Sequence, residues 1–240
     1  MKILCLDSTA KVATAAVLCG DEVLAEYTVN GGGRSHSELL LPMVRSLLTS
    51  VGMTPDDIDL FACTAGPGSF TGVRIGVSVI KGIAFGRNKP CCAVSSLEAL
   101  AAQVAPLPCL VAPVMDARRG QVYNALFRID ADGALHRLTP DRALPAEELA
   151  EELATLYKGE SVALVGDGIA VAQRALTNAN VELLALPYPI RLQSAAAAGR
   201  VAYRMAQGGD VVTDDALRPV YLRLPQAERE RLERLAQENQ

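Results

Sequence analysis

The stretch GPGSFTGVRIG, residues 66–76, decides how the rest of the sequence is interpreted. An apolar run at residues 60–65 precedes it and predicts a buried strand. The Gly-Pro-Gly triplet then interrupts regular structure, and Ser69 or Thr71 offers a side-chain oxygen to a free N–H of a following helix. We therefore expect a strand, a tight turn and a capped helix over residues 70–87.

Four glycines lie in that predicted helix, at positions 72, 76, 82 and 86. Each costs a helix on the order of 1 kcal/mol relative to Ala. Their spacing, in pairs one turn apart, indicates that another backbone packs closely against the helix. A phosphate cradle at the helix N-terminus is the alternative interpretation. The stretch lacks the Gly-Lys-Ser/Thr of a Walker A loop and does not match G-x-G-x-x-G, so the residues favour packing.

The composition predicts a large hydrophobic core and a net charge that does not attract nucleic acid. It has 240 residues, enough for one large domain or two small lobes, and 50% of them are hydrophobic. The formal net charge of -4 leaves only a local basic patch as a means of contacting nucleic acid. The absence of Trp argues against base-stacking platforms.

Cysteine usage and hydropathy bear on the compartment. The six Cys lie mostly in apolar runs without a C-x-x-C pair, which is typical of reduced, buried thiols. No signal peptide follows Met1, and prolines in the longest uncharged run, residues 99–115, exclude a membrane helix there. We expect a cytoplasmic protein without a membrane segment.

The first half of the sequence alternates between strand and helix patterns. Its first strand ends at Asp7, and a short turn leads into an antiparallel return. The predicted elements are strands at residues 3–6, 12–18, 22–29, 60–65 and 91–94 and helices at 35–51, 70–87 and 95–104.

The pattern restarts after a proline cluster at residues 106–108. A strand again ends at an acidic residue, Asp116, and a turn and a second strand follow. We expect lobes over residues 1–105 and 106–224, and a charged tail, 225–240, that is solvated or forms a small docking helix. The elements predicted in the second lobe are strands at residues 109–115, 121–128 and 161–165 and helices after Pro145, at 169–176 and at 194–207.

The glycine-rich stretch resembles the hallmark of the TsaB (YeaZ) family. Shorter pieces agree in order: LDST at residues 6–9, SHSE at 35–38 and DARRG at 116–120. The resemblance extends from Met1 to about Leu222. It implies the α/β fold of the actin, sugar-kinase and Hsp70 (ASKHA) superfamily, with duplicated βββαβα lobes. The strand–Asp–turn–strand repeat favours the same fold.

The resemblance also implies a function. Members of this family are non-catalytic homologues of TsaD that support its transfer of a threonylcarbamoyl group to adenosine 37 of tRNAs reading ANN codons. The implied partners are a TsaD-like catalytic subunit, a TsaE-like ATPase through the complex, a second copy of the chain when it is alone, and tRNA indirectly. We therefore expect no enzyme activity from the chain itself.

The family pairs through two helices, which correspond here to residues 39–51 and 70–87. Apolar residues of the first helix cover about 200° of its surface, more than one core face requires. We expect its second apolar face to meet the glycine-rich helix, another subunit, or both. The candidate partner-interface residues are Leu40, Met43, Val44, Leu47, Gly72, Ile75, Gly76, Val79, Ile80 and Ile83.

A nucleotide cleft between the lobes is also implied, and we expect it to be degenerate. Asp7 and Asp116 follow the first strand of each half, where Asp also forms simple Asx turns. Arg118 stands where active relatives have small residues, and Asp167 introduces a carboxylate into their adenosine loop. The cleft candidates are Asp7, Ser8, Asp116, Arg118, Gly166 and Gly168.

The sequence gives little support for catalysis. The catalytic relatives use an H-x-x-x-H metal pair, but His36 and His136 are the chain's two histidines and lie far apart. We expect no catalytic residue, no metal and no cofactor in the lone chain, and leave open ATP or ADP binding by the assembled complex. The alternatives are a small-molecule kinase or ATPase of the same fold and, with less support, a protease, since neither a compelling Ser-His-Asp order nor H-E-x-x-H occurs.

Overall fold

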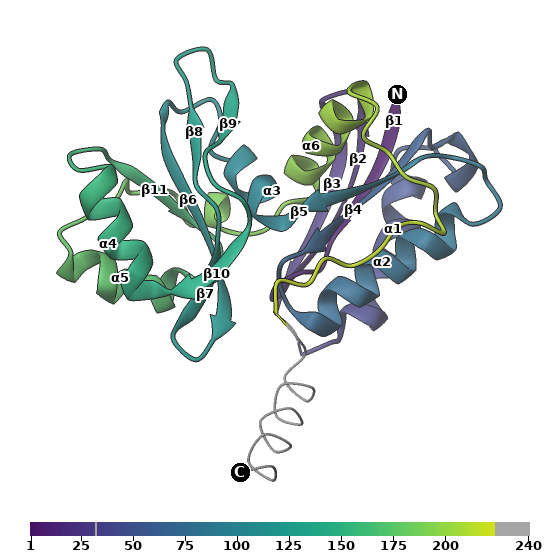
Figure 1. Cartoon of the computed structure of the whole chain (residues 1–240). Helices are drawn as coiled ribbons and strands as arrows, with labels where there is room; N and C mark the ends of the chain where they lie inside the picture. The colour runs from purple at the N-terminus through teal and green to yellow at the C-terminus, as the bar shows by residue number, and fades with distance from the viewer. Residues whose placement is uncertain (32, 224–240) are drawn as a thin grey trace, which may run out of the picture.

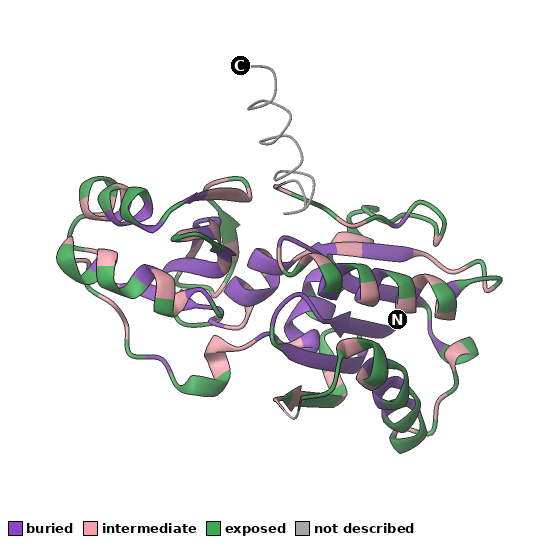
Figure 2. Cartoon of the chain, turned by 90° about the horizontal axis from the view of Figure 1, so that it is seen from below, coloured by how far each residue is buried: buried purple, intermediate pink, exposed green. Residues whose placement is uncertain are grey.

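The computed structural model describes residues 1–31 and 33–223, so the predicted charged tail lies outside the described residues. Two β-sheets, each covered by helices, stand on either side of the short helix α3, Ser96–Ala102 (Figure 1). Buried residues concentrate along the strands, and exposed residues line the outer faces of the helices (Figure 2). Each sheet therefore has its own core, and α3 lies between the two.

The first sheet contains five strands in the order β3-β2-β1-β4-β5. Strands β1, β2 and β3 form an antiparallel meander, whereas β4 and β5 extend the sheet in parallel from β1. Successive residues of β1 alternate between two cores, Ile3 and Cys5 on one face and Leu4 and Leu6 on the other, so the central strand is apolar throughout. The strands are β1 Lys2–Asp7, β2 Val12–Cys19, β3 Glu22–Asn30, β4 Leu60–Gly66 and β5 Cys91–Ser95.

Helices α1, His36–Ser50, and α2, Phe70–Ala84, cover one face of this sheet. Ser35 begins α1 with a capping box, and the Ser69 side chain accepts a hydrogen bond from the Gly72 N–H at the start of α2. The predicted strand, turn and capped helix around residues 66–76 are therefore confirmed. A 3-10 turn, η1 Pro55–Asp57, leads from α1 into β4.

The opposite face is covered by α6, Ala195–Gln207, which packs against β1, β2, β4 and β5 (Figure 1). The sequence analysis predicted this helix as part of the second lobe, and that prediction is wrong because α6 packs on the first sheet. Small side chains let α6 lie close to the sheet, and Val201 adds to the core between them. The chain thus returns to the first lobe after completing the second, and the division near residue 105 remains a prediction.

The second sheet is ordered β10-β7-β6-β8-β9, with β11 pairing in parallel with β6. The predicted strand at residues 121–128 divides into β7 and β8, which pair with different halves of β6. The short strands β9 and β10 were not predicted. The strands are β6 Cys109–Arg118, β7 Gln121–Asn124, β8 Phe127–Ile129, β9 Leu135–Arg137, β10 Arg142–Pro145 and β11 Val162–Val165.

Helices α4, Ala146–Leu156, and α5, Ile169–Asn178, pack together over one face of the second sheet, and α3 packs on the other. A 3-10 turn, η2 Tyr188–Arg191, leads back toward α6. Within residues 1–31 and 33–223, no helix combines the length and apolar character needed to span a membrane.

Candidate functional site

A cavity of about 660 Å³ lies between the two lobes. Its walls come from the loop after β1, the Gly-Pro-Gly turn, the N-terminus of α2, the end of β6, Asp167 and the C-terminal residues 220–223. The family resemblance implied a cleft between the lobes, but most of the candidate residues do not line this cavity. Of the six candidate residues, Asp116 and Arg118 line it; the described lining includes neither Asp7, Ser8, Gly166 nor Gly168.

Asp7 is buried at the end of β1, beneath the loop rather than in the cavity. Its Oδ1 accepts hydrogen bonds from the Thr9 N–H at 2.9 Å and the Thr9 hydroxyl at 2.7 Å, which is the Asx turn considered from the sequence. Among the described residues, Oδ2 has no hydrogen-bond partner. Burial raises the pKa of Asp7, although the Thr9 hydrogen bonds act in the opposite direction.

Ser8 connects this loop to α2 through a hydrogen bond. Its Oγ donates a 2.9 Å hydrogen bond to the Gly72 carbonyl. A Cβ on Gly72 would lie 2.0 Å from the Ser8 carbonyl oxygen, and one on Gly76 would lie 2.6 Å from Ser8 Oγ. Both glycines are thus required for a close approach within the chain, as the packing interpretation predicted. Gly82 has open space around it, so the packing does not extend to that position.

The second strand–Asp–turn differs in its exposure. Asp116 accepts a hydrogen bond from the Arg118 N–H at 2.7 Å and pairs with the Arg118 guanidinium at 3.0 Å. The pKa of Asp167 is raised by burial, and the charge of nearby Asp116 acts in the same direction. This side of the cleft therefore combines two carboxylates with a guanidinium that is already paired.

Gly166 and Gly168 are explained by packing. A Cβ on Gly166 would lie 2.2 Å from the Val114 carbonyl oxygen, and one on Gly168 would lie 2.8 Å from the Met115 carbonyl carbon. The Gly168 N–H donates to the Val114 carbonyl. The turn after β11 consequently lies directly against β6.

Each histidine has a hydrogen-bond partner other than Asp7, Asp116 or Asp167. His36 Nε2 lies 3.4 Å from the Lys11 carbonyl oxygen at the start of α1, and the exposed His136 pairs with Asp130 at 2.8 Å. Within the described ranges, no group of three or more His, Cys, Asp or Glu side chains is placed to hold a metal ion. The expected absence of metal chemistry stays a prediction.

The candidate partner surface needs a correction. Seven of its ten residues are buried inside the first lobe and cannot offer an exposed surface: Leu40, Met43, Val44, Leu47, Gly72, Gly76 and Ile80. They fill the core between the helices and the sheet. Ile75, Val79 and Ile83 are half-buried and lie on one stripe of α2, so these three remain candidates.

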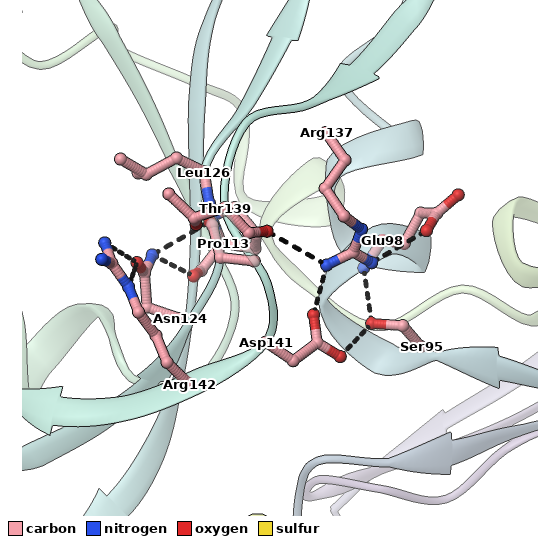
Figure 3. Close-up of polar contacts among 10 residues, drawn as sticks. Ser95, Glu98, Pro113, Asn124, Leu126, Arg137, Thr139, Asp141 and Arg142 are labelled. Carbon is pink, nitrogen blue, oxygen red and sulfur yellow. Dashed lines mark hydrogen bonds and ion pairs between the residues drawn. The ribbon is translucent and has the colours of Figure 1, made fainter.

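A polar network joins the lobes beside α3 (Figure 3). The Ser95 hydroxyl, at the end of β5, donates to Asp141 at 2.7 Å. Arg137 bridges from Asp141 to Glu98 of α3, at 2.5 and 2.8 Å, and its guanidinium lies 4.6 Å from the centre of the Phe127 ring. The first sheet, α3 and the second lobe are thus connected by charge-assisted hydrogen bonds.

The sequence did not single out several residues that shape the cavity, among them Tyr221 and Arg223. The Tyr221 ring packs on Phe70, with ring centres 4.8 Å apart, and its hydroxyl accepts a 2.8 Å hydrogen bond from Arg74. The Arg223 guanidinium donates to the Ala117 carbonyl at 2.8 Å. These contacts join segments far apart in sequence, so no local pattern indicates them.

Comparisons with known proteins relate the chain to one family. The family model TsaD, tRNA N6-adenosine threonylcarbamoyltransferase, matches residues 22–229. The tRNA threonylcarbamoyladenosine biosynthesis protein TsaB of Escherichia coli is 33% identical over 93% of this chain and 95% of that protein. TsaB of Bacillus subtilis is 40% identical over 64% of this chain and 66% of that protein.

Solved structures give the same result. YeaZ from Pseudomonas aeruginosa is 28% identical, with a TM-score of 0.75, over 92% of this chain and 99% of that chain. A ROK hexokinase from Thermus thermophilus is 14% identical with a TM-score of 0.51, over 86% of this chain and 100% of that chain, which supports the fold alone. The fold is that of the actin, sugar-kinase and Hsp70 superfamily. The chain belongs to the TsaB (YeaZ) family, within the wider family that the threonylcarbamoyltransferase model describes.

Proposed function

We propose that this chain is the non-catalytic partner subunit of a TsaD-like threonylcarbamoyltransferase. Together the two subunits would form threonylcarbamoyladenosine at adenosine 37 of tRNAs that read ANN codons. The names of the relatives support a role in the biosynthesis of this modified nucleoside. We further propose a cytoplasmic location, a TsaE-like ATPase that acts through the complex, and indirect contact with tRNA.

The closure of the first loop is the observation that most supports a non-catalytic role. Ser8 is buried and bonded to Gly72, and one oxygen of Asp7 is occupied by Thr9. These are the polar groups that a nucleotide-binding relative would direct at phosphate and metal. Here they stabilise the turn and its contact with α2, and the cavity lies beyond them.

The proposed partner surface is the stripe of α2 formed by Ile75, Val79 and Ile83. These side chains are partly accessible while also packing on the first core, so a partner helix would complete their burial. The same stripe would allow two copies of the chain to pair when the catalytic subunit is absent. The exposed Phe85, just after α2, adds apolar surface at the end of this helix.

Reconstitution from purified components tests the proposal. The chain is combined with the TsaD-like subunit and TsaE-like ATPase of its own organism, tRNA and threonylcarbamoyl-AMP, and modified nucleoside is measured by mass spectrometry of digested tRNA. We expect product with both subunits present and none from either alone. Product from this chain without the TsaD-like subunit would overturn the non-catalytic assignment.

A calorimetric titration separates the kinase or ATPase alternative. The lone chain is titrated with ATP and Mg²⁺, and then assayed for phosphate release. We expect neither binding heat nor turnover, because the first loop is closed on α2. Tight binding with hydrolysis by the lone chain would favour the alternative.

A further inference from the structure

The segment after α6 returns across the molecule to the cleft (Figure 1, yellow). It passes the edge of the first sheet, where Val212 and Cys91 exchange two backbone hydrogen bonds of 2.8 Å. Leu217 is then buried in the core beneath α2. Residues 220–223 finally form part of the wall of the interlobe cavity.

One stripe of α2 holds this segment. Phe70 packs on the Tyr221 ring, Arg74 donates to the Tyr221 hydroxyl, and Lys81 donates to the carbonyls of Asp215 and Leu217 at 3.0 and 3.2 Å. At 3.6 residues per turn, Phe70, Arg74 and Lys81 lie within about 40° of one another around the helix. The stripe differs from the proposed partner surface, which lies on another side of α2.

The segment also closes over the Gly-Pro-Gly turn. The Val220 N–H donates a 2.7 Å hydrogen bond to the Ala65 carbonyl at the end of β4. A Cβ on Gly66 would lie 2.3 Å from the Val220 carbonyl oxygen, so only glycine allows the backbones to approach this closely. Residue 220 therefore covers the turn before α2.

The last described contact crosses to the second lobe. Arg223 donates a 2.8 Å hydrogen bond to the Ala117 carbonyl, which lies near the end of β6. Val220 and Tyr221 remain about half exposed, 47% and 41%, so this end of the segment is held mainly by surface contacts. On the other side of the molecule, α3 packs into the second core and Arg137 fixes Asp141 to Glu98. Ala10, in the loop after β1, also packs into the second core. Among the described residues, the lobes are thus joined by buried contacts at α3 and Ala10 and by a surface contact at Arg223.

We propose that residues 220–223 are a releasable latch that holds the interlobe cavity closed, anchored in the core by Leu217. Release of Tyr221 and Arg223 from α2 and Ala117 lets the second lobe rotate away about α3 and the Arg137 network. The latch would control access to the cavity for any ligand. The proposal therefore does not depend on the proposed function. The latch is attached to α2 of the first lobe through Tyr221, and its Arg223 contact reaches the second lobe.

Distances between spin labels on the two lobes test the latch in the 240-residue chain. Labels are placed at Thr49→Cys on α1 and Thr155→Cys on α4, both exposed, in a background where Cys19 and Cys109 are replaced by Ser. The remaining thiols are buried. We expect a single interlobe distance in the unchanged protein, and an added longer-distance population in the double variant Tyr221→Ala/Arg223→Ala.

Arg200→Ala is the matched control. Its guanidinium also donates to a backbone carbonyl, that of Asp21, at 3.0 Å, but within the first lobe. We expect this variant to keep the single distance. Hydrogen exchange of peptides spanning residues 217–223 shows whether the segment has been released, with exchange about tenfold faster or more in the double variant.

Val220→Pro provides a second route to release, because proline cannot donate the hydrogen bond to Ala65. Circular dichroism melting confirms that each variant is folded. Faster exchange in the segment without any change in the interlobe distance would overturn the proposal. Unchanged exchange in both the double variant and Val220→Pro would overturn it as well, since the segment would then not be releasable.

Discussion

Ser8 donates a hydrogen bond from its side chain to the Gly72 carbonyl, 2.9 Å away, and joins the first loop to the first turn of α2. Because Gly76 lies one turn further along the same face, Ser8 Oγ also occupies the space where a side chain at position 76 would begin. A single serine thus accounts for two glycines of the stretch that decides the fold. The polar group that could have faced a phosphate is used to pack a loop on a helix.

The first prediction follows from this contact. Gly76→Ala places a Cβ 2.6 Å from Ser8 Oγ, so Ser8 must move and lose its bond to Gly72. We expect a loss of about 1–3 kcal/mol in the free energy of unfolding, the usual cost of overpacking. In a chain of this size each kcal/mol lowers Tm by roughly 2–4 °C. Thermal melting by circular dichroism measures the change.

Gly82→Ala is the control on the same helix. Nothing lies within 4 Å of its added Cβ, and Ala is favoured over Gly in a helix by about 1 kcal/mol. We expect Tm to stay the same or rise. If both variants lost the same stability, contact with Ser8 would not be the reason that position 76 needs glycine.

The second prediction concerns the proposed partner surface. Val79→Glu puts a charge into the half-buried stripe of α2, whereas Ser78→Glu puts one on the neighbouring exposed position. We expect the Val79 variant to remain folded but to lose pairing with itself and with the TsaD-like subunit, while the Ser78 variant pairs normally. Sedimentation and pull-down assays measure pairing. Normal pairing by a folded Val79→Glu protein would contradict the proposed surface.

Much of this architecture could be predicted from local patterns. Apolar runs bounded by turn residues located β1 to β5, and an acidic residue after the first strand of each half indicated the duplicated unit. The prediction of close packing at Gly72 rested on the cost of glycine in a helix, and it was correct without knowledge of Ser8. Such features succeed because their cause lies within a few neighbouring residues.

The remaining errors concern contacts between distant segments. Residues 121–128 are apolar at most positions, so the point where the chain leaves β7 and enters β8 has no periodic signal. The place of α6 depends on the first sheet, which lies far earlier in the sequence. Arg74 and Tyr221, separated by 147 positions, meet because the chain returns to the cleft after α6. Seven of the ten residues predicted for the interface are buried in the first lobe, because apolar periodicity does not distinguish a core from a partner surface.

The third prediction tests the network beside α3. Arg137→Ala leaves Glu98 and Asp141 without their shared cation and removes a guanidinium from the Phe127 ring. We expect a loss of about 1–3 kcal/mol in unfolding free energy, as for hydrogen bonds to charged groups. Arg128→Ala breaks the more exposed pair with Glu160 inside the second lobe and should cost about 0–1 kcal/mol. Denaturant melts compare the unfolding free energies of the two variants. Equal losses would mean that the Arg137 network stabilises the fold no more than an exposed ion pair does.

The fourth prediction concerns Asp7, whose pKa is raised by burial. The folded state then favours the protonated carboxyl, so its contribution to stability is full below about pH 4, the ordinary range for Asp, and is lost as pH rises through the folded-state pKa. Asp7→Asn keeps an oxygen for Thr9 and cannot ionise, so we expect its Tm to gain on the native protein's as pH rises, with tRNA modification retained in the reconstituted complex. Asp130→Asn should show the opposite slope below about pH 4, because the His136 hydrogen bond lowers the pKa of Asp130 and the stability that it contributes is lost as pH falls. Melting curves of the three proteins from acid to neutral pH test both slopes, and a Tm difference for Asp7→Asn that does not change with pH would mean that folding does not raise the pKa of Asp7.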